Sequence, residues 1–380
     1  MNWTWRGIIA VLVVLIIVLT IKPSLFEPAS VAQKLEGQIY IGGLLPLSNI
    51  PQDKEILLTE LRNSAVLAVE DINYNGGIDN HQLILVYGDT ECNSGKAVNA
   101  ALDMIDNYET SAFVAAQCGD ELDALAKVTD EKRKLLFSVT DFDPNAQMLE
   151  HDLFFKNSMV NNETMSKFRE ILTTQFNLTK IAFLFEDKEY PVRFKEDIKK
   201  ELEDSVFIVA EEGFKTTDTD FRAPLAKIKS SKPEAIILLG QTPETMYILL
   251  QQIKQQGMNQ MIITNNVVSE LIDMEGAELD NVFYIDAARE VSEDFLKKYE
   301  ARFGEDLKNK FLASCMYDSL HLLKDSIEET IEFPYDMSEY LKQLEDHEGT
   351  SGKMSIRRNG NIVHEICLNQ IKNNEVYLVE

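Results

Sequence analysis

Basic residues are scarce in this sequence. Its 380 residues include 37 lysines and arginines against 63 aspartates and glutamates, which gives a formal net charge of -26 at pH 7. Binding to nucleic acid requires clustered Lys and Arg that neutralise phosphates, and no such clusters are seen. The composition therefore argues against nucleic acid as a partner, and the acidic excess indicates a solvated surface.

Signatures of catalysis and of nucleotide or metal binding are also missing. No GxGxxG follows the first predicted strand, and the chain contains no GxxxxGK[ST], GxSxG or HExxH. The histidines are scattered without the spacing of metal ligands; they are His81, His151, His321, His347 and His364. We therefore expect a protein that is not an enzyme and that holds no metal or other cofactor.

A long uncharged apolar run lies at the N-terminus, where residues 7–21 read GIIAVLVVLIIVLTI. Such a run is typical of a signal segment. With the tryptophans at positions 3 and 5 placed at the interface, residues 3–25 are long enough to span a bilayer. The sequence therefore predicts export, with the rest of the chain outside the cytoplasm.

Two fates are open for this segment. Ser30-Val31-Ala32 offers a small-residue cleavage site, but it lies unusually far beyond the apolar run, and the lipobox cysteine of a lipoprotein is missing. We expect an uncleaved signal anchor over residues 1–25 and a tether over residues 26–37. Cleavage after Ala32 is the alternative.

The globular part is organised around residues 67–92, LAVEDINYNGGIDNHQLILVYGDTEC. Apolar residues before the turn recur at spacings of three and four, which predicts a helix with one core-facing stripe. Asn75-Gly76-Gly77 ends this helix, because glycine accepts a positive φ without a steric clash. Residues 83–87, LILVY, then form a short buried strand.

The same alternation of helix and strand continues along the chain and then restarts. Strands are expected at 39–45, 83–87, 112–116 and 135–139, and again at 180–185, 206–210, 234–239, 260–264 and 281–285. Strands that are separated by single helices indicate a right-handed, doubly wound parallel sheet. The fold class is therefore α/β, with two such lobes.

Three segments resemble the opening of a known family. They are IYIGGLLPLSN at 39–49, LAVEDINYNGGI at 67–78 and YGDTEC at 87–92. The chain is similar to the type I periplasmic solute-binding proteins, in particular the branched-chain amino-acid (Leu/Ile/Val-binding protein-like) receptors of ABC transporters. The resemblance continues to the C-terminus.

This resemblance implies two lobes that are joined by a three-strand hinge and close around a ligand. On the family's pattern the chain crosses between lobes near Asn157, Asp286 and Gly349. The expected domains are then lobe 1 at 38–157 and 287–348, and lobe 2 at 158–286 and 349–380.

The cysteines are few, at positions 92, 118, 315 and 367. Cys92 and Cys118 each lie just past a predicted strand, where the loops of a parallel sheet gather, and many relatives in the resembling family have a disulfide at the same two places. We expect these two to pair. Cys315 and Cys367 are expected to act as small buried hydrophobic residues.

Ligands of open parallel sheets bind outside the carboxyl ends of the strands. The residues that follow the predicted strands are therefore the candidates for ligand binding: Ser48, Gly119, Asp120, Asp141, Phe142, Asp143, Tyr190, Gln241 and Asn266.

The side chains in these loops differ from those of the amino-acid receptors in the resembling family. The family holds the ligand carboxylate with backbone N–H groups and Ser/Thr hydroxyls, whereas here Asp120 and Glu121 follow Gly119, and Asp141 or Asp143 replaces an expected hydroxyl. Asp120 and Glu121 could alternatively be first-turn acids that the helix dipole favours. In the second lobe Tyr190 falls on one of the family's tyrosines, while Gln241 and Asn266 replace a tyrosine and an acid.

We therefore expect a membrane-anchored, extracytoplasmic solute-binding protein, in the periplasm or at the cell surface, that delivers a small polar metabolite to an ABC permease. The replaced residues favour a ligand that is cationic or rich in N–H and O–H donors, stacked on Tyr190, over leucine, isoleucine or valine. The alternative is the ligand-binding sensor module of a membrane signalling system.

Overall fold

A computed structural model describes residues 37–50, 55–116, 119–140, 151–158, 162–202, 205–272, 274, 279–287, 291–304, 306–330 and 334–379. The expected anchor and tether at 1–37 lie outside these ranges except for residue 37. Within them, no helix combines the length and the apolar composition needed to cross a bilayer.

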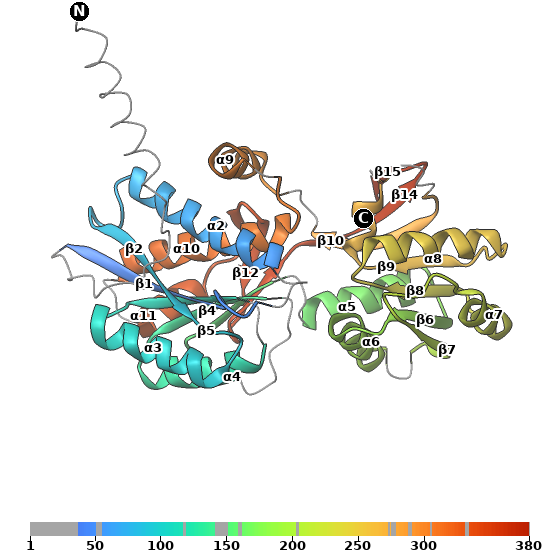
Figure 1. The fold of residues 1–380 in the computed structure, drawn as a ribbon, viewed down its shortest axis with the longest axis horizontal. Coiled ribbons are helices and arrows are strands. Elements are labelled where there is room, and N and C mark those ends of the chain that lie inside the picture. Colours follow the sequence, from blue (N-terminus) through green and yellow to red (C-terminus); the bar gives the residue numbers. More distant parts are fainter. Residues whose placement is uncertain are drawn as a thin grey trace, which may run out of the picture. The chain divides into compact units, whose positions relative to one another are not determined.

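The described residues form two mainly parallel sheets with flanking helices, which confirms the expected α/β architecture of two lobes (Figure 1). The first sheet has eight strands. In spatial order they are β11 (His347–Gly349), β12 (Gly352–Ile356), β13 (Asn361–His364), β5 (Phe154–Asn157), β4 (Leu135–Val139), β3 (Ala112–Ala116), β1 (Gln38–Leu45) and β2 (Gln82–Asp89).

The helices of this first lobe lie on both faces of its sheet (Figure 1). One face packs against α2 (Glu55–Tyr74), α9 (Glu293–Phe303), α10 (Lys310–Thr330) and α11 (Pro334–Leu341). The other packs against α3 (Ser94–Tyr108) and α4 (Gly119–Glu131).

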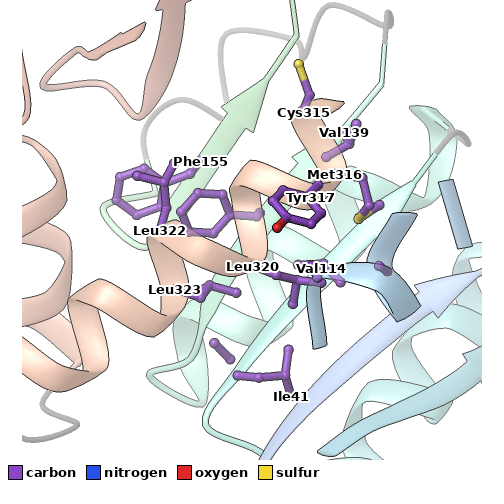
Figure 2. Close-up of a cluster of buried hydrophobic side chains, with 14 of the residues drawn as sticks. Ile41, Val114, Val139, Phe155, Cys315, Met316, Tyr317, Leu320, Leu322 and Leu323 are labelled. Atoms are coloured by element: carbon purple, nitrogen blue, oxygen red, sulfur yellow. The ribbon is translucent and has the colours of Figure 1, made fainter. Parts of the chain in front are cut away.

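Helix α10 lies at the centre of the first core. Figure 2 shows Met316, Leu320 and Leu323 among Ile41 of β1 and Val114 of β3. The helix is buried over much of its circumference, as is typical of a helix that other elements cover on several sides.

The second sheet has seven strands. In spatial order they are β15 (Glu375–Leu378), β14 (Ile366–Lys372), β10 (Val282–Ala287), β9 (Met261–Thr264), β8 (Ala235–Leu239), β6 (Lys180–Glu186) and β7 (Phe207–Phe214). Its helical elements are α5 (Asn162–Glu170), η3 (Ile171–Gln175), α6 (Glu189–Glu201), α7 (Arg222–Ser231), α8 (Pro243–Gln255) and η4 (Asn266–Leu271).

The turn that ends α2 has the predicted form. The N–H of Gly77 donates to the carbonyl of Ile72 at 2.9 Å, and Gly77 has a φ of 77°. A Cβ at this position would lie 2.0 Å from the carbonyl oxygen of His81, so only glycine fits. Strand β2 follows and pairs in parallel with β1.

The chain passes from the first sheet to the second after β5, returns after β10, and passes again between β13 and β14. The expected third crossing at Gly349 is therefore wrong. Residues 361 and 362 of β13 pair with Lys156 and Asn157 of β5, and Ile362 is buried in the first core. A hairpin pattern predicts strands, but it does not tell which sheet they join, and here burial of Ile362 decides it.

Candidate functional site

Glu186, the last residue of β6, joins three loops at the carboxyl edge of the second sheet. Its side chain is fully buried. Its Oε2 accepts the backbone N–H groups of Gln241 at 2.7 Å and of Thr242 at 3.1 Å. Its Oε1 accepts the hydroxyls of Thr242 at 2.7 Å and of Thr216 at 2.5 Å. Because β8 and β7 flank β6, one carboxylate fastens the ends of three neighbouring strands.

The environment of Glu186 keeps this carboxylate ionised. Burial alone would raise its pKa, but the hydrogen bonds from Thr216, Thr242 and Gln241 outweigh burial and lower the pKa below its ordinary value. Lys188 adds a weaker contribution, since its Nζ lies 3.5 Å from Oε1 and also donates to the hydroxyl of Thr242. The second-lobe edge therefore carries an ionised carboxylate that already accepts hydrogen bonds from the neighbouring loops.

The three candidates of the second lobe lie around this carboxylate or beside it in the sheet. Tyr190 is in the first turn of α6, and its ring stacks on Phe194 with centroids 5.7 Å apart. Gln241 offers an exposed side chain while its backbone is bound to Glu186. Asn266 begins η4 and is partly exposed.

The amide next to Asn266 has a different role that sequence reasoning missed. Asn265 is buried, and its Nδ2 donates to the carbonyl of Gly240 at 2.8 Å while its Oδ1 accepts the N–H of Gly240 at 3.2 Å. This pair fixes the loop after β8 to the loop after β9. Glu186 therefore holds the backbone of Gln241, and Asn265 holds the backbone of the preceding Gly240.

In the first lobe, Ser48 is bound to Asp89, the last residue of β2. The hydroxyl of Ser48 donates to Oδ2 at 2.5 Å, and Oδ1 accepts the backbone N–H of Leu47 at 2.8 Å and of Glu91 at 3.1 Å. Burial would raise the pKa of Asp89, but these hydrogen bonds lower it overall. The candidate Ser48 is thus placed by an acid that sequence reasoning did not single out.

Glu121, beside the candidate Asp120, lies in the first turn of α4, in line with the alternative expectation for it. Its side chain is fully buried there. Oε1 accepts the hydroxyl of Thr90 at 3.1 Å, whereas Oε2 has no hydrogen-bond partner among the described residues. Burial is the main cause that raises its pKa to about 7; the nearby charge of Asp89 adds to the rise.

The remaining first-lobe candidates are described in part or not at all. Gly119 begins α4, and of Asp120 only the helical backbone is described. Asp141, Phe142, Asp143 and Cys118 lie outside the described residues. Cys315 and Cys367 are both buried, as expected.

Helix α10 holds the segments at which the chain leaves the first sheet. Asn157, which ends β5, donates from Nδ2 to the carbonyl of Cys315 at 3.0 Å and to the hydroxyl of Ser319 at 3.1 Å. His364, which ends β13, places its Nε2 2.7 Å from Oδ1 of Asn157. The first and third crossings are therefore fastened to each other and to one turn of α10.

The second crossing is linked to the same turn of α10. Asp318 accepts the backbone N–H groups of Thr350 and Ser351, both at 2.8 Å. The carbonyl of Thr350 in turn accepts the N–H of Ser292 at 2.8 Å, just before α9. A change in the direction of any crossing would thus alter its hydrogen bonds to residues 315–319 of α10.

Chemically, the described candidates at the two edges offer hydrogen-bond donors and acceptors and the aromatic ring of Tyr190. Within the described ranges, no group of three or more His, Cys, Asp or Glu could hold a metal ion. This inventory suits recognition of a small polar molecule.

A family model described as "Periplasmic binding protein" matches residues 38–374. The chain is 26% identical over 252 residues to the leucine-, isoleucine-, valine-, threonine- and alanine-binding protein of Pseudomonas aeruginosa, a match that covers 66% of this chain and 64% of that protein. It is 25% identical to an amino acid binding protein of the same organism, over 55% of this chain and 56% of the relative. The match thus spans less than two thirds of either relative.

Solved structures share the fold. The branched-chain amino acid transporter substrate-binding protein LivJ of Streptococcus pneumoniae, in complex with isoleucine, superposes with a TM-score of 0.66 at 23% identity, covering 90% of this chain and 99% of that one. An ABC transporter substrate-binding protein of Desulfitobacterium hafniense, in complex with Leu, has a TM-score of 0.67 at 17% identity, covering 90% and 100%.

Proposed function

Because the chain belongs to the periplasmic binding protein family, we propose that it captures a small, amino-acid-like polar molecule outside the cytoplasm and delivers it to an ABC permease. The observation that carries this proposal is the family match over residues 38–374, which spans both sheets and every candidate loop. The relatives are named for binding amino acids, which favours capture for transport over the sensor alternative.

Capture works by closure of the two lobes, with the three crossings as the hinge. The ties of Asn157, His364 and Asp318 to α10 support this mode, because they give all crossings a common base on the first lobe. Each lobe then moves as a body, and only the few residues between the strands change their backbone angles.

The ligand we propose carries an N–H-rich or cationic group as well as an amino-acid core. Gln241 and Asn266 offer amides, and Tyr190 offers an aromatic wall. The burial of Glu121 takes one acid away from the binding surface, so this preference rests on Asp120, Asp141 and Asp143.

Attachment and oxidation state complete the proposal. Residues 1–25 anchor the protein in the membrane as an uncleaved signal segment, and residues 26–37 are a tether. Cys92 pairs with Cys118. Support for the pairing comes from the position of Cys92 just after β2, and from the burial of the other two cysteines in the described ranges, Cys315 and Cys367.

Titration calorimetry of the purified full chain tests this function with four probes: L-arginine, L-asparagine, L-threonine and L-leucine. We expect saturable micromolar binding of at least one of the first three. Tyr190→Ala should weaken it roughly tenfold, since an aromatic contact contributes up to about 1.5 kcal/mol.

Tyr74→Ala is the matched control, because Tyr74 is 90% exposed and ends α2 at the amino edge of the first sheet. Equal losses in both tyrosine variants, or no binding of any probe, would contradict the proposal. Tight binding of L-leucine that persists when Asp141 and Asp143 are both changed to Asn would overturn the ligand preference alone.

A further inference from the structure

The buried carboxylate of Glu186 has an unusual set of hydrogen-bond partners. Buried acids in proteins normally pair with a basic group, because taking a charge out of water is costly. Here the closest contacts are four neutral donors at 2.5 to 3.1 Å, from two backbone amides and two hydroxyls. Lys188 lies farther away, at 3.5 Å, and its side chain is 33% exposed.

The donors come from loops that are distant in sequence. Thr216 follows β7, and Gln241 and Thr242 follow β8, so the carboxylate is 30 and 55 residues away from its partners along the chain. Hydrogen bonds to an ionised acceptor are about twice as strong as neutral ones. A single side chain therefore restricts the loop that presents Gln241.

A second glutamate in the same lobe provides a contrast. Glu234 also accepts two backbone amides and a hydroxyl, from Thr179 and Lys180, but it directly precedes β8, beside the amino end of β6, and is exposed. Ligands of open parallel sheets bind outside the carboxyl ends of the strands, so we expect no ligand at the edge that holds Glu234. The two glutamates thus have similar bonding and opposite positions in the lobe.

We infer that Glu186 is a positioning residue for solute capture: its carboxylate fixes the loop after β8 in advance, so that Gln241 meets the solute without first being ordered. The inference rests on the proposed function. Prior ordering raises affinity because the entropy of fixing a loop is not lost again on binding. The role needs an acceptor at this point, and not a negative charge that the solute senses.

This distinction can be read from two substitutions. Glu186→Ala removes the acceptor, which leaves the amides of Gln241 and Thr242 unbound. Glu186→Gln keeps one acceptor oxygen for these amides, while its NH2 group can donate to the hydroxyls of Thr216 and Thr242, which accept as readily as they donate. We expect Glu186→Ala to weaken binding at least tenfold, because all four hydrogen bonds are lost. We expect Glu186→Gln to stay within about threefold of the wild type, because its amide keeps these hydrogen bonds as neutral ones.

The experiment combines two readouts on the full chain. Hydrogen–deuterium exchange by mass spectrometry follows peptides that cover residues 238–245 without any solute, and calorimetry follows L-asparagine and L-arginine. In Glu186→Ala we expect faster exchange over 240–242 together with the loss of affinity, and near-wild-type values of both in Glu186→Gln. Glu234→Ala is the control: it should speed exchange at 179–180 and leave affinity unchanged.

Unchanged exchange at 240–242 in Glu186→Ala would overturn the inference, as would an equal loss of affinity in Glu186→Gln, which would show that the charge itself matters. If Glu186→Ala does not fold, Thr242→Val removes one of the four donors and should give the same changes at smaller size; no change in exchange would then overturn the inference. If neither probe binds the wild type, the proposed ligand class fails, and the exchange readout still decides the role of Glu186.

Discussion

The two lobes each place a fully buried glutamate near the carboxyl edge of the sheet, and the pKa values of the two side chains are shifted in opposite directions. Glu186 in the second lobe meets four donors, and its pKa is lowered. Glu121 in the first lobe meets only the hydroxyl of Thr90 among the described residues, and its pKa is raised to about 7. Both side chains are fully buried, so the difference comes from the larger set of hydrogen bonds around Glu186 and from the nearby charges: Lys188 lowers the pKa of Glu186, whereas Asp89 raises the pKa of Glu121.

This contrast shows that burial of a carboxylate does not by itself set its charge. The second-lobe edge holds a constant charge that organises its loops. The first-lobe edge holds a carboxyl group that gains or loses a proton near neutral pH. The first-lobe edge is therefore the one that we expect to respond to pH near neutrality.

The largest difference should appear when each glutamate is replaced by leucine. Glu186→Leu leaves two amides and two hydroxyls without their acceptor, and we expect a loss of about 3 to 5 kcal/mol in the free energy of unfolding. Glu121→Leu removes a poorly satisfied carboxyl group, and we expect a change within about 1 kcal/mol or a gain. Urea unfolding at pH 7.5 measures both, and equal losses would break the comparison.

Reduction of the proposed Cys92–Cys118 disulfide should loosen the first-lobe edge alone. Cys92 lies two residues after Thr90, the partner of Glu121, so the bond to Cys118 would restrain this loop. We expect Cys92→Ala to lower the unfolding free energy by about 2 to 4 kcal/mol. Unreduced peptide mapping identifies the pair, and free thiols at both positions in exported protein would contradict it.

The pH dependence of stability should follow Glu121. Its folded pKa of about 7 exceeds the ordinary value of 4.5, so the folded state binds more protons between these values and stability falls as pH rises through this window. Glu121→Gln should remove this slope. Its free energy of unfolding, taken relative to the wild type, should be higher at pH 8 than at pH 5 by an amount on the order of 2 kcal/mol.

Glu186 should act with the opposite sign. Because its folded pKa is lowered, its contribution is present above the ordinary value of 4.5 and is lost as pH falls through the folded pKa. Unfolding free energies from pH 3 to pH 8 separate the two residues. A gain for Glu121→Gln that is larger at pH 5 than at pH 8 would contradict the sign derived for Glu121.

Ser48→Ala should have the smallest effect of the series. It removes one hydrogen bond to Asp89 but leaves the backbone donors of Leu47 and Glu91. We expect a loss of about 1 kcal/mol in the free energy of unfolding and a small rise in the pKa of Asp89. Thermal unfolding detects the loss, and a change above about 3 kcal/mol would mean that the loop after β1 depends on Ser48 far more than its contacts indicate.

The sequence predicted the sheets well because buried strands such as 112–116 and 235–239 are short apolar runs that single helices separate. It failed at the third crossing, because the residues of β12 and β13 carry no mark of the sheet that they join. Pairing of residues 361 and 362 with β5 is a long-range contact, and no local pattern encodes it.

At the site, the loops were predicted and several roles were not. Burial of Glu121 could have been inferred, since it lies four residues before the buried Leu125 on the same helix face. Asn265 and Asn266 differ by one position, and only the backbone geometry shows that Asn265 turns inward to Gly240. The four donors around Glu186 come from two separate parts of the chain, residue 216 and residues 241–242, so spacing alone does not reveal them.

The opposite charging of the two edges can be measured directly by NMR of the full chain labelled at the glutamate carboxyl carbons, followed from pH 3 to pH 9 and assigned with Glu121→Gln and Glu186→Gln. The account predicts that one carboxyl titrates near pH 7 and vanishes in Glu121→Gln, while the signal lost in Glu186→Gln titrates below the ordinary value of 4.5. Titration of both carboxyls near 4.5, or in the reverse order, would contradict it.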